Sequence, residues 1–478
     1  MRIALQFSPQ QPPIDCARLE YAFRLFCAIY GHQPLVDSEP VASAELTITY
    51  QPQAQSTATL PLTSAYVARP THLPAPPPTP YSRDDESTVL LCSRFPRTEP
   101  DWLGEIFEWV SSADEYSITT QDAVGRVPFS ASYIGRHQLN PRVPYAAVAM
   151  RFLQRAISRA VPGSPLAPQS PTPSGDHFVV NTHDVDVLPA SRWSSLHRLA
   201  RNALVSLALY KSPVLAAKQA GRALRFALGA DDPLDQVPAL AKREREHSAG
   251  ASYYFICRHE HRRDGNYSVQ DPYTLSLMRA LQPKMEVGIH GSYRSLEDAD
   301  GLASEFDCLR ALGFDPLGGR QHWLRFTVPQ LLHAVQRVNA AYDSSLGWPK
   351  TMGYRAGACF AYPPYDFERE GPASFLEIPL AVMDGEICAP HNGDRNGIHA
   401  ASEVLAASRR YGWGGIAVLW HPTAFGGVQL PEYVGDAFWN VLKDGLQAND
   451  IWTSAASFVK TVWPRYVASG LLPRREFP

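Results

Sequence analysis

HFVVNTHDVD, residues 177 to 186, is a short apolar run that ends in polar residues, among them Asp184 and Asp186. An apolar run of this length is typical of a buried strand. Two carboxylates just past a strand can take different tasks, one binding a metal while the other accepts a proton from water. Such pairs also cap helices and bind surface cations, so the rest of the chain has to distinguish these interpretations.

The same pattern, an apolar run closed by polar residues, recurs along the rest of the chain. The further runs are Ala251–Cys257, Met285–Ile289, Gly318–Leu324, Ala341–Tyr342, Leu376–Met383 and Gly415–Trp420. Helical lengths of chain separate them, which is typical of a parallel sheet or a (β/α) barrel. In barrels the residues that follow the strands converge at one rim. We therefore predict an α/β fold with a distorted (β/α)7-type barrel, and a closing helix over Ile451–Tyr466.

Two histidines stand directly after such runs. His290 follows Met285–Ile289 and precedes a Gly-Ser turn, and His421 follows a run that ends at Trp420. A histidine at a strand end can ligate a metal, and in its protonated form it can give a proton to a leaving amine. Each could equally be a histidine that hydrogen-bonds a turn.

A proline-rich stretch, residues 162–175, has no apolar periodicity and is typical of an interdomain linker. Before it, residues 1–161 mix helical and strand patterns without a catalytic constellation. We predict a smaller accessory α/β domain there, followed by the barrel over residues 176–478. A helical insertion is expected at about residues 191–250.

The insertion is basic as well as helical. Its cationic side chains include Arg198, Arg201, Lys211, Lys218, Arg222 and Arg225. Basic amphipathic helices can lie on membranes or bind anionic sugars. A solvated basic face over a packed apolar face is the commoner case, and we expect it here.

The composition bears on the possible partners of the protein and on its cellular compartment. The chain has 478 residues, a formal net charge of -3 and seven cysteines. The charge gives no reason to expect a nucleic acid or membrane partner. The cysteines are scattered and form no CxxC pair, which fits reduced thiols better than a disulfide framework. No signal-peptide core and no apolar run of about 18 residues is present, so we predict a cytoplasmic protein without a transmembrane segment. The sequence does not predict the oligomeric state.

Five motifs in order along residues 176–466 resemble those of the polysaccharide deacetylase (NodB-homology) superfamily, the fourth carbohydrate esterase family. They are Thr182–Asp186, Ala251–Phe255, His290-Gly291-Ser292, Gly353–Gly357 and Leu419-Trp420-His421. Five motifs in the right order are far more specific than any one of them. Arg320-Gln321-His322 and Tyr342–Ser345 also resemble a bacterial subgroup that carries an additional N-terminal domain and tends to be associated with surface-polysaccharide biosynthesis.

The resemblance implies a role for each matching residue. Asp184 is then the base, Asp186 and His290 bind a divalent metal, Arg355 orients Asp184, and His421 is the general acid. It implies a hydrolase that removes an acetyl group, with N-acetyl favoured, from a carbohydrate substrate. Zinc is the expected metal because the ligands mix oxygen and nitrogen.

The sequence departs from the family pattern at Arg294, where a second metal-binding histidine usually stands. Arginine stays protonated and cannot be a ligand. His322, in the next strand candidate, is the best replacement, against a structural or sugar-binding role. Candidates for substrate binding are Arg320, Tyr293 and Asp343, although Arg320 could instead form a structural ion pair and Asp343 could cap a helix.

Two alternatives remain open from the sequence. One is a catalytically inactive protein that binds glycans or scaffolds a larger complex, since Arg294 weakens the metal motif. The other is an amidase or esterase that keeps the metal but acts on a non-sugar acyl substrate or an O-acetyl group.

Overall fold

A computed structural model of the chain describes residues 1–8, 10–35, 44–50, 59–61, 79–81, 91–93, 101–189, 191–208, 211–282, 284–298, 300–387 and 394–477. Its largest sheet is parallel and has the order β14-β11-β10-β9-β8-β7-β16-β15, with β17 also paired to β7. The strands are β7 (His177–Val185), β8 (Ser252–Phe255), β9 (Glu286–Gly291), β10 (Gly318–Gln321), β11 (Tyr342–Asp343), β14 (Leu376–Glu377), β15 (Leu380–Met383), β16 (Gly414–Leu419) and β17 (Asp450–Thr453).

The sheet is curled into a distorted barrel. Strands β14 and β15 lie at its two opposite edges, yet only Ile378 and Pro379 separate them along the chain. The edges therefore approach each other, and the Ile378 N–H donates to the carbonyl of Asp343 on β11 while the Leu380 N–H donates to the Leu346 carbonyl. This confirms the predicted α/β class and barrel.

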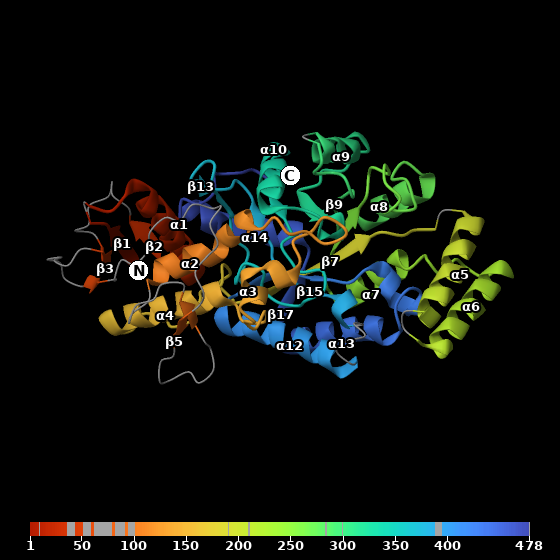
Figure 1. Cartoon of the computed structure of the whole chain (residues 1–478), viewed down its shortest axis with the longest axis horizontal. Coiled ribbons are helices and arrows are strands. Elements are labelled where there is room, and N and C mark those ends of the chain that lie inside the picture. The colour runs from red at the N-terminus through yellow and green to blue at the C-terminus, as the bar shows by residue number, and fades with distance from the viewer. Residues whose placement is uncertain are drawn as a thin grey trace.

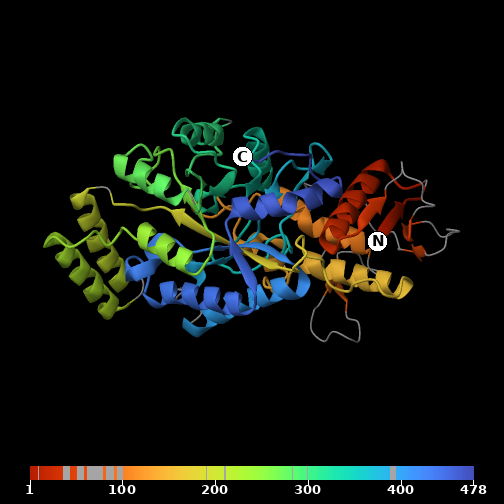
Figure 2. The ribbon, with the colours of Figure 1, turned by 180° about the vertical axis from the view of Figure 1, so that it is seen from behind.

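Helices surround the sheet (Figures 1 and 2). In the barrel region they are α5 (Arg192–Ala208), α6 (Pro213–Ala227), α7 (Val237–Glu246), α8 (Pro272–Leu281), α9 (Gly301–Ala311), α10 (Val328–Arg337), α11 (Asp384–Ile387), α12 (Asp394–Tyr411), α13 (Tyr433–Gln447) and α14 (Ala455–Ala468). The last segment differs from its prediction, because Ile451 belongs to strand β17 and the closing helix α14 begins only at Ala455. The alternating burial of β17, with Asp450 and Trp452 buried and Ile451 exposed, is typical of a strand.

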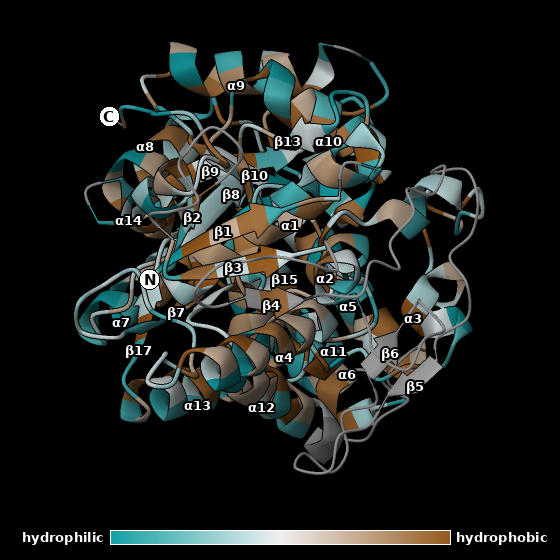
Figure 3. Cartoon of the chain, turned by 90° about the vertical axis from the view of Figure 1, so that its left-hand side faces the viewer, coloured by the Kyte–Doolittle hydropathy of each residue, from teal (hydrophilic) through white to brown (hydrophobic). Residues whose placement is uncertain are grey.

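The N-terminal part has its own parallel sheet of order β2-β1-β3-β4, with β1 at Arg2–Gln6, β2 at Gln33–Leu35, β3 at Leu46–Thr49 and β4 at Thr59–Pro61. Strands β1 and β3 lie side by side in Figure 3 and carry hydrophobic residues. Helices α1 (Pro13–Tyr30), α2 (Trp102–Val110), α3 (Tyr133–Arg136) and α4 (Tyr145–Ala160) complete this part, and an antiparallel pair joins β5 (Thr79–Tyr81) to β6 (Leu91–Ser93). The small β12 (Tyr365–Asp366) and β13 (Gly371–Pro372) pair within the barrel region.

The two parts share one continuous hydrophobic core. The Tyr21 hydroxyl on α1 donates to the Pro363 carbonyl at 2.6 Å, and Arg18 on the same helix pairs with Glu370 at 2.7 Å. The division into a domain over residues 1–161, a linker and a barrel domain stays a prediction.

The insertion is helical, and Leu199 and Phe226 pack in a small core as expected, but other large apolar residues do not. Trp193 on α5 is 82% exposed and Leu224 on α6 is 61% exposed. The two helices form a hairpin at the end of the molecule opposite the N-terminal sheet, in both views (Figures 1 and 2). Asn202 on α5 donates to the Val428 carbonyl, and Gln219 and Arg222 on α6 donate to the Gly427 carbonyl, so one side of the hairpin contacts the rest of the chain. Among the described residues, no helix is long and apolar enough to cross a membrane.

Candidate functional site

The site lies at the carboxyl ends of neighbouring strands. In β7, alternation places Thr182 and Asp184 on one face, while His183 on the other face is buried between Glu244 and the Trp420 carbonyl. Strand β9 brings His290 to the same rim, and in the ladder His290 is the partner of Arg320 on β10. The parallel register thus gathers residues from three separate strands, β7, β9 and β10.

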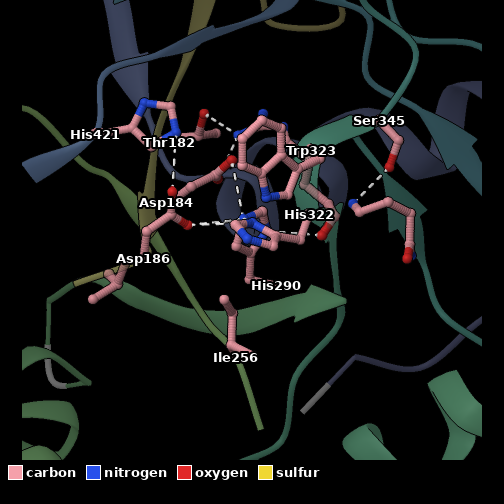
Figure 4. Close-up of polar contacts among 12 residues, drawn as sticks. Thr182, Asp184, Asp186, Ile256, His290, His322, Trp323, Ser345 and His421 are labelled. Atoms are coloured by element: carbon pink, nitrogen blue, oxygen red, sulfur yellow. Dashed lines mark hydrogen bonds and ion pairs between the residues drawn. The ribbon is translucent and has the colours of Figure 1, made fainter. Parts of the chain in front are cut away.

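Three potential metal ligands meet in front of these strands. The Asp186 Oδ1 atom lies 3.3 Å from Nε2 of His290 and 3.4 Å from Nδ1 of His322. The two histidine nitrogens are 2.9 Å apart. Figure 4 shows both rings turned toward the aspartates, with His421 on the other side. The structure therefore brings together the three residues that were predicted as ligands, within 4.8 Å of one another.

The hydrogen bonds of the two histidines fix which nitrogens face the centre. Nδ1 of His290 lies 3.0 Å from the Arg320 carbonyl, and Nε2 of His322 lies 2.7 Å from the Arg263 carbonyl. A carbonyl can only accept, so each of these nitrogens carries the proton. In neutral rings the two facing nitrogens then present lone pairs to each other. A cation between them, either a proton or a metal ion, removes this repulsion.

Asp186 completes the triad with an oxygen that needs a partner. Its Oδ1 atom is buried and accepts no hydrogen bond from the described residues. Burial raises the pKa of Asp186, but the neighbouring His322, His290 and His421 outweigh burial and hold this pKa well below its usual value. The carboxylate is ionised, and one carboxylate with two imidazoles suits a divalent metal of the zinc class, which binds imidazole in its neutral form.

Asp184 has a different environment from Asp186. Its Oδ1 atom accepts a hydrogen bond from Arg320 at 2.8 Å, and its Oδ2 atom lies 3.6 Å from Nε2 of His290. Burial alone would raise the pKa of Asp184, yet Arg320 and then His290 and His421 lower it below its usual value. Asp184 is thus a buried, ionised carboxylate with one oxygen fixed by Arg320.

His421 is held by a carboxylate that sequence reasoning gave no catalytic task. Its Nδ1 atom lies 3.0 Å from Oδ1 of Asp384, whose Oδ2 accepts the His421 backbone N–H at 2.7 Å. Nε2 lies 3.7 Å from Oδ2 of Asp186. Burial lowers the pKa of His421, but Asp384, Asp186 and Asp184 outweigh it and raise that pKa to about 10. The ring is therefore an imidazolium at neutral pH.

The arginine next to Asp184 is not the one that the sequence motif indicated. The Arg355 guanidinium donates to both carboxylate oxygens of Glu115, at 2.7 and 2.5 Å, and to the Gly347 carbonyl. It also lies over the rings of Phe326 and Trp348. Arg355 therefore joins the barrel to the N-terminal part of the chain, and Arg320 takes the contact with Asp184 that was predicted for Arg355.

Arg320 and Asp343, two of the predicted substrate-binding residues, are both buried. Arg320 is fully buried and donates to Asp184, Thr182 and the Ser344 carbonyl. It therefore forms a structural ion pair with Asp184, which was the alternative prediction. Asp343 is 2% exposed and accepts the Ser345 backbone N–H at 2.7 Å.

Tyr293, the third predicted substrate-binding residue, lies among aromatic and cationic side chains. Its ring stacks on His261 with the ring centres 4.3 Å apart, and the Arg325 guanidinium lies over the ring. Its hydroxyl donates to the Val124 carbonyl at 3.2 Å and also contacts Arg263.

Arg294, which replaces the usual histidine, pairs with Glu297 at 3.4 Å and is half exposed.

Trp323 stands beside the triad in a strained backbone conformation. Its φ is 62°, and the following Leu324 has a φ of 50°. Bulky residues rarely adopt positive φ, and such strain costs of order 1–3 kcal/mol. The turn lets His322 face His290 while the indole, 43% exposed, stands at the rim (Figure 4).

No protein-family model and no curated protein matches the chain. The solved structures that are similar to it include the peptidoglycan deacetylase PdaC from Bacillus subtilis and a mutant of the same protein. Each is 12% identical, and each match covers 63% of this chain and 97% of the other, with TM-scores of 0.29 and 0.30. This likeness is too low to bear on the fold or the function of this chain.

Proposed function

We propose that the protein is a metal-dependent hydrolase that removes an N-acetyl group from a sugar or a polysaccharide precursor. The observation that carries the proposal is the meeting of Asp186, His290 and His322, with Asp184 on one side and the His421–Asp384 pair on the other. The ordered sequence motifs, which resemble carbohydrate deacetylases, supply the substrate class.

The residues fit the proposed metal. The buried Oδ1 atom of Asp186 and the facing nitrogens of His290 and His322 are three atoms that can donate an electron pair to one cation. Three protein ligands leave a position open, as catalytic zinc sites require, and His322 supplies the ligand that Arg294 cannot. A bound zinc ion would polarise both a water molecule and the acyl carbonyl.

The two aspartates then have separate tasks. Asp184, ionised and oriented by Arg320, accepts the proton of the attacking water. Asp186 is committed to the metal. Fixing Asp184 through one oxygen leaves the other oxygen, which faces His290, to receive the proton.

His421 supplies the proton that the leaving nitrogen needs. Its raised pKa keeps it protonated at neutral pH, and Asp384 fixes the ring so that Nε2 faces the centre. An amine is a poor leaving group until it is protonated, and a positioned acid typically accelerates such a step by roughly 10²–10⁴-fold. The exposed indole of Trp323 offers an apolar surface for a sugar ring.

Acetate release from N-acetylated glucosamine oligomers, measured with metal-loaded protein, tests the proposal. We expect turnover in the wild type, with Asp184→Asn retaining the metal but losing turnover. Stoichiometric metal without turnover on any N-acetylated saccharide would contradict the sugar substrate. Absence of bound metal would instead favour the glycan-binding, inactive alternative.

A further inference from the structure

The hairpin formed by α5 and α6 buries several uncharged polar side chains and exposes many of its large apolar ones. Ser195, Ser206 and Gln219 are 0–1% exposed. Of the eleven large hydrophobic side chains that are exposed among the described residues, six belong to this hairpin, namely Trp193, Leu204, Leu207, Val214, Leu224 and Leu228. A surface helix of a globular protein normally shows the opposite pattern.

The exposed apolar residues form one stripe on each helix. On α6, Val214, Leu224 and Leu228 are separated by ten and four positions, which returns to the same side of the helix. On α5, Leu204 and Leu207 are three positions apart, and Trp193 lies three turns before Leu204. Apolar side chains thus run along the outer face of both helices.

The hairpin is also the most basic part of the chain. Residues 191–230 contain seven arginines and lysines and no aspartate or glutamate, although the whole chain has a net charge of -3. Lys218 and Arg222 share Glu432, at 3.0 and 2.7 Å. Within the described part of the chain, no salt bridge engages Arg201, Lys211 or Arg225. The outer surface therefore carries an uncompensated positive charge between its apolar stripes.

The hairpin is a built element and not a loosely placed one. Leu199 and Phe226 pack with Val187, Leu234 and Val428 in a small separate core at its base. Arg192 donates to the Ala227 carbonyl at 2.7 Å and so joins the start of α5 to the end of α6. These contacts involve the inner side of the hairpin, and the large apolar side chains on its outer side stay exposed.

We propose that this hairpin docks the protein onto the surface of a bilayer that contains anionic lipid. Exposed tryptophan and leucine suit the boundary between headgroups and acyl chains, and unpaired arginine and lysine are complementary to anionic headgroups. A second copy of the chain is disfavoured as the occupant, because it would place the exposed Arg201, Lys211 and Arg225 of one copy against those of the other. Since α5 begins six residues after Asp186, the docked hairpin would also bring the rim of the barrel near the membrane.

Cosedimentation of the full-length protein with vesicles tests the proposal independently of enzymatic activity. We expect binding to vesicles of phosphatidylcholine with phosphatidylglycerol, weakening as salt rises, and little binding to phosphatidylcholine alone. Leu204→Glu combined with Leu224→Glu should lower the partition coefficient by roughly 100-fold, at about tenfold for each leucine removed from the bilayer. Leu166→Glu, at a leucine that is 60% exposed outside the hairpin, is the matched control and should bind like the wild type.

Fluorescence gives a second readout that is local to the hairpin. Brominated anionic lipid should quench the wild type more than Trp193→Phe, because Trp193 is the exposed indole of the hairpin. The proposal is overturned if neither vesicle binds the protein, or if the leucine variants bind as tightly as the Leu166→Glu control. It is also overturned if the leucine substitutions abolish self-association in solution while vesicle binding is absent, since the occupant is then a second copy.

Discussion

Nδ1 of His322 lies 2.9 Å from Nε2 of His290, and each ring uses its other nitrogen to donate to a backbone carbonyl. Two lone pairs at this distance repel each other in a medium that screens charge weakly. The arrangement is stable when a cation lies between the rings and the Asp186 carboxylate. In the proposed metal site, His322 would compensate for the histidine that position 294 lacks.

The first prediction concerns the third ligand. His322→Phe keeps the ring volume but removes the nitrogen, so it should weaken zinc binding by more than the ~10–100-fold that changes beyond the ligands cost. His399→Phe, at an exposed histidine on α12, should leave zinc binding unchanged. Elemental analysis of protein dialysed against zinc would measure both. A full equivalent of zinc in His322→Phe would exclude His322 as a ligand.

The second prediction separates Arg320 from Arg355. Arg320 holds the pKa of Asp184 down, and a neighbouring arginine lowers a carboxyl pKa by about 1–3 units. In Arg320→Gln the pKa of Asp184 therefore rises, and the acidic limb of the pH–rate profile should move to higher pH. Arg320→Lys should restore part of the shift.

Arg355→Gln is the matched control for this prediction. It breaks the pair with Glu115 and should lower the free energy of unfolding, but it leaves the acidic limb in place. If Arg355→Gln moved the limb and Arg320→Gln did not, the sequence motif would be correct and the contact in the structure irrelevant to catalysis.

Much of the fold could be predicted from the sequence because each short buried strand is visible as a local run of apolar residues. The run before His421 is continuous and apolar, as strands covered on both faces are, and the runs before Asp184 and His290 are largely apolar. Strand β17 escaped because it is only four residues long and is followed at once by the apolar helix α14. Local pattern cannot separate a short apolar strand from the helix that follows it.

The residues that could bind a metal were predictable from their types and positions. The contacts between side chains that are far apart in the sequence were not. Asp186 and His322 directly follow strands β7 and β10, and His290 lies near the end of β9. Parallel strands end at one rim, so the meeting of these residues follows from topology. Topology does not determine which arginine contacts Asp184. Arg355 is drawn away by Glu115, which lies 240 positions earlier, and no local pattern records that pairing. The pairing of Asp384 with His421 is similarly a contact between two strand ends.

The third prediction concerns the general acid. Burial opposes protonation of His421, but Asp384 outweighs burial, and the pKa of about 10 keeps the ring charged through neutral pH. Removing the charge in Asp384→Asn lowers that pKa, so the alkaline limb of the pH–rate profile should move to lower pH. His421→Gln should reduce kcat by roughly 10²–10⁴-fold while zinc stays bound. An alkaline limb that is the same in Asp384→Asn and the wild type would assign the limb to another group.

The fourth prediction is about stability and concerns Asp450, the first residue of β17. Its carboxylate accepts from His177 at 2.9 Å and from two nitrogens of Arg409, at 2.9 and 2.5 Å, and so joins β17 to β7 and α12. Burial raises the pKa of Asp450, but these donors outweigh it and hold the pKa below its usual value. A lowered carboxyl pKa stabilises the fold above the pKa of the unfolded chain, and this contribution is lost as pH falls through the folded pKa.

Asp450→Asn should therefore lower the free energy of unfolding by about 3 kcal/mol at pH 7, as expected for breaking a buried ion pair. The difference between variant and wild type should shrink below about pH 4, where the unfolded carboxyl is protonated. Asp307→Asn, which breaks the exposed pair with Arg310, should change that free energy by less than about 0.5 kcal/mol at either pH. Urea denaturation of the three proteins at both pH values measures this. A difference that stays constant with pH would show that Asp450 acts through packing and not through its charge.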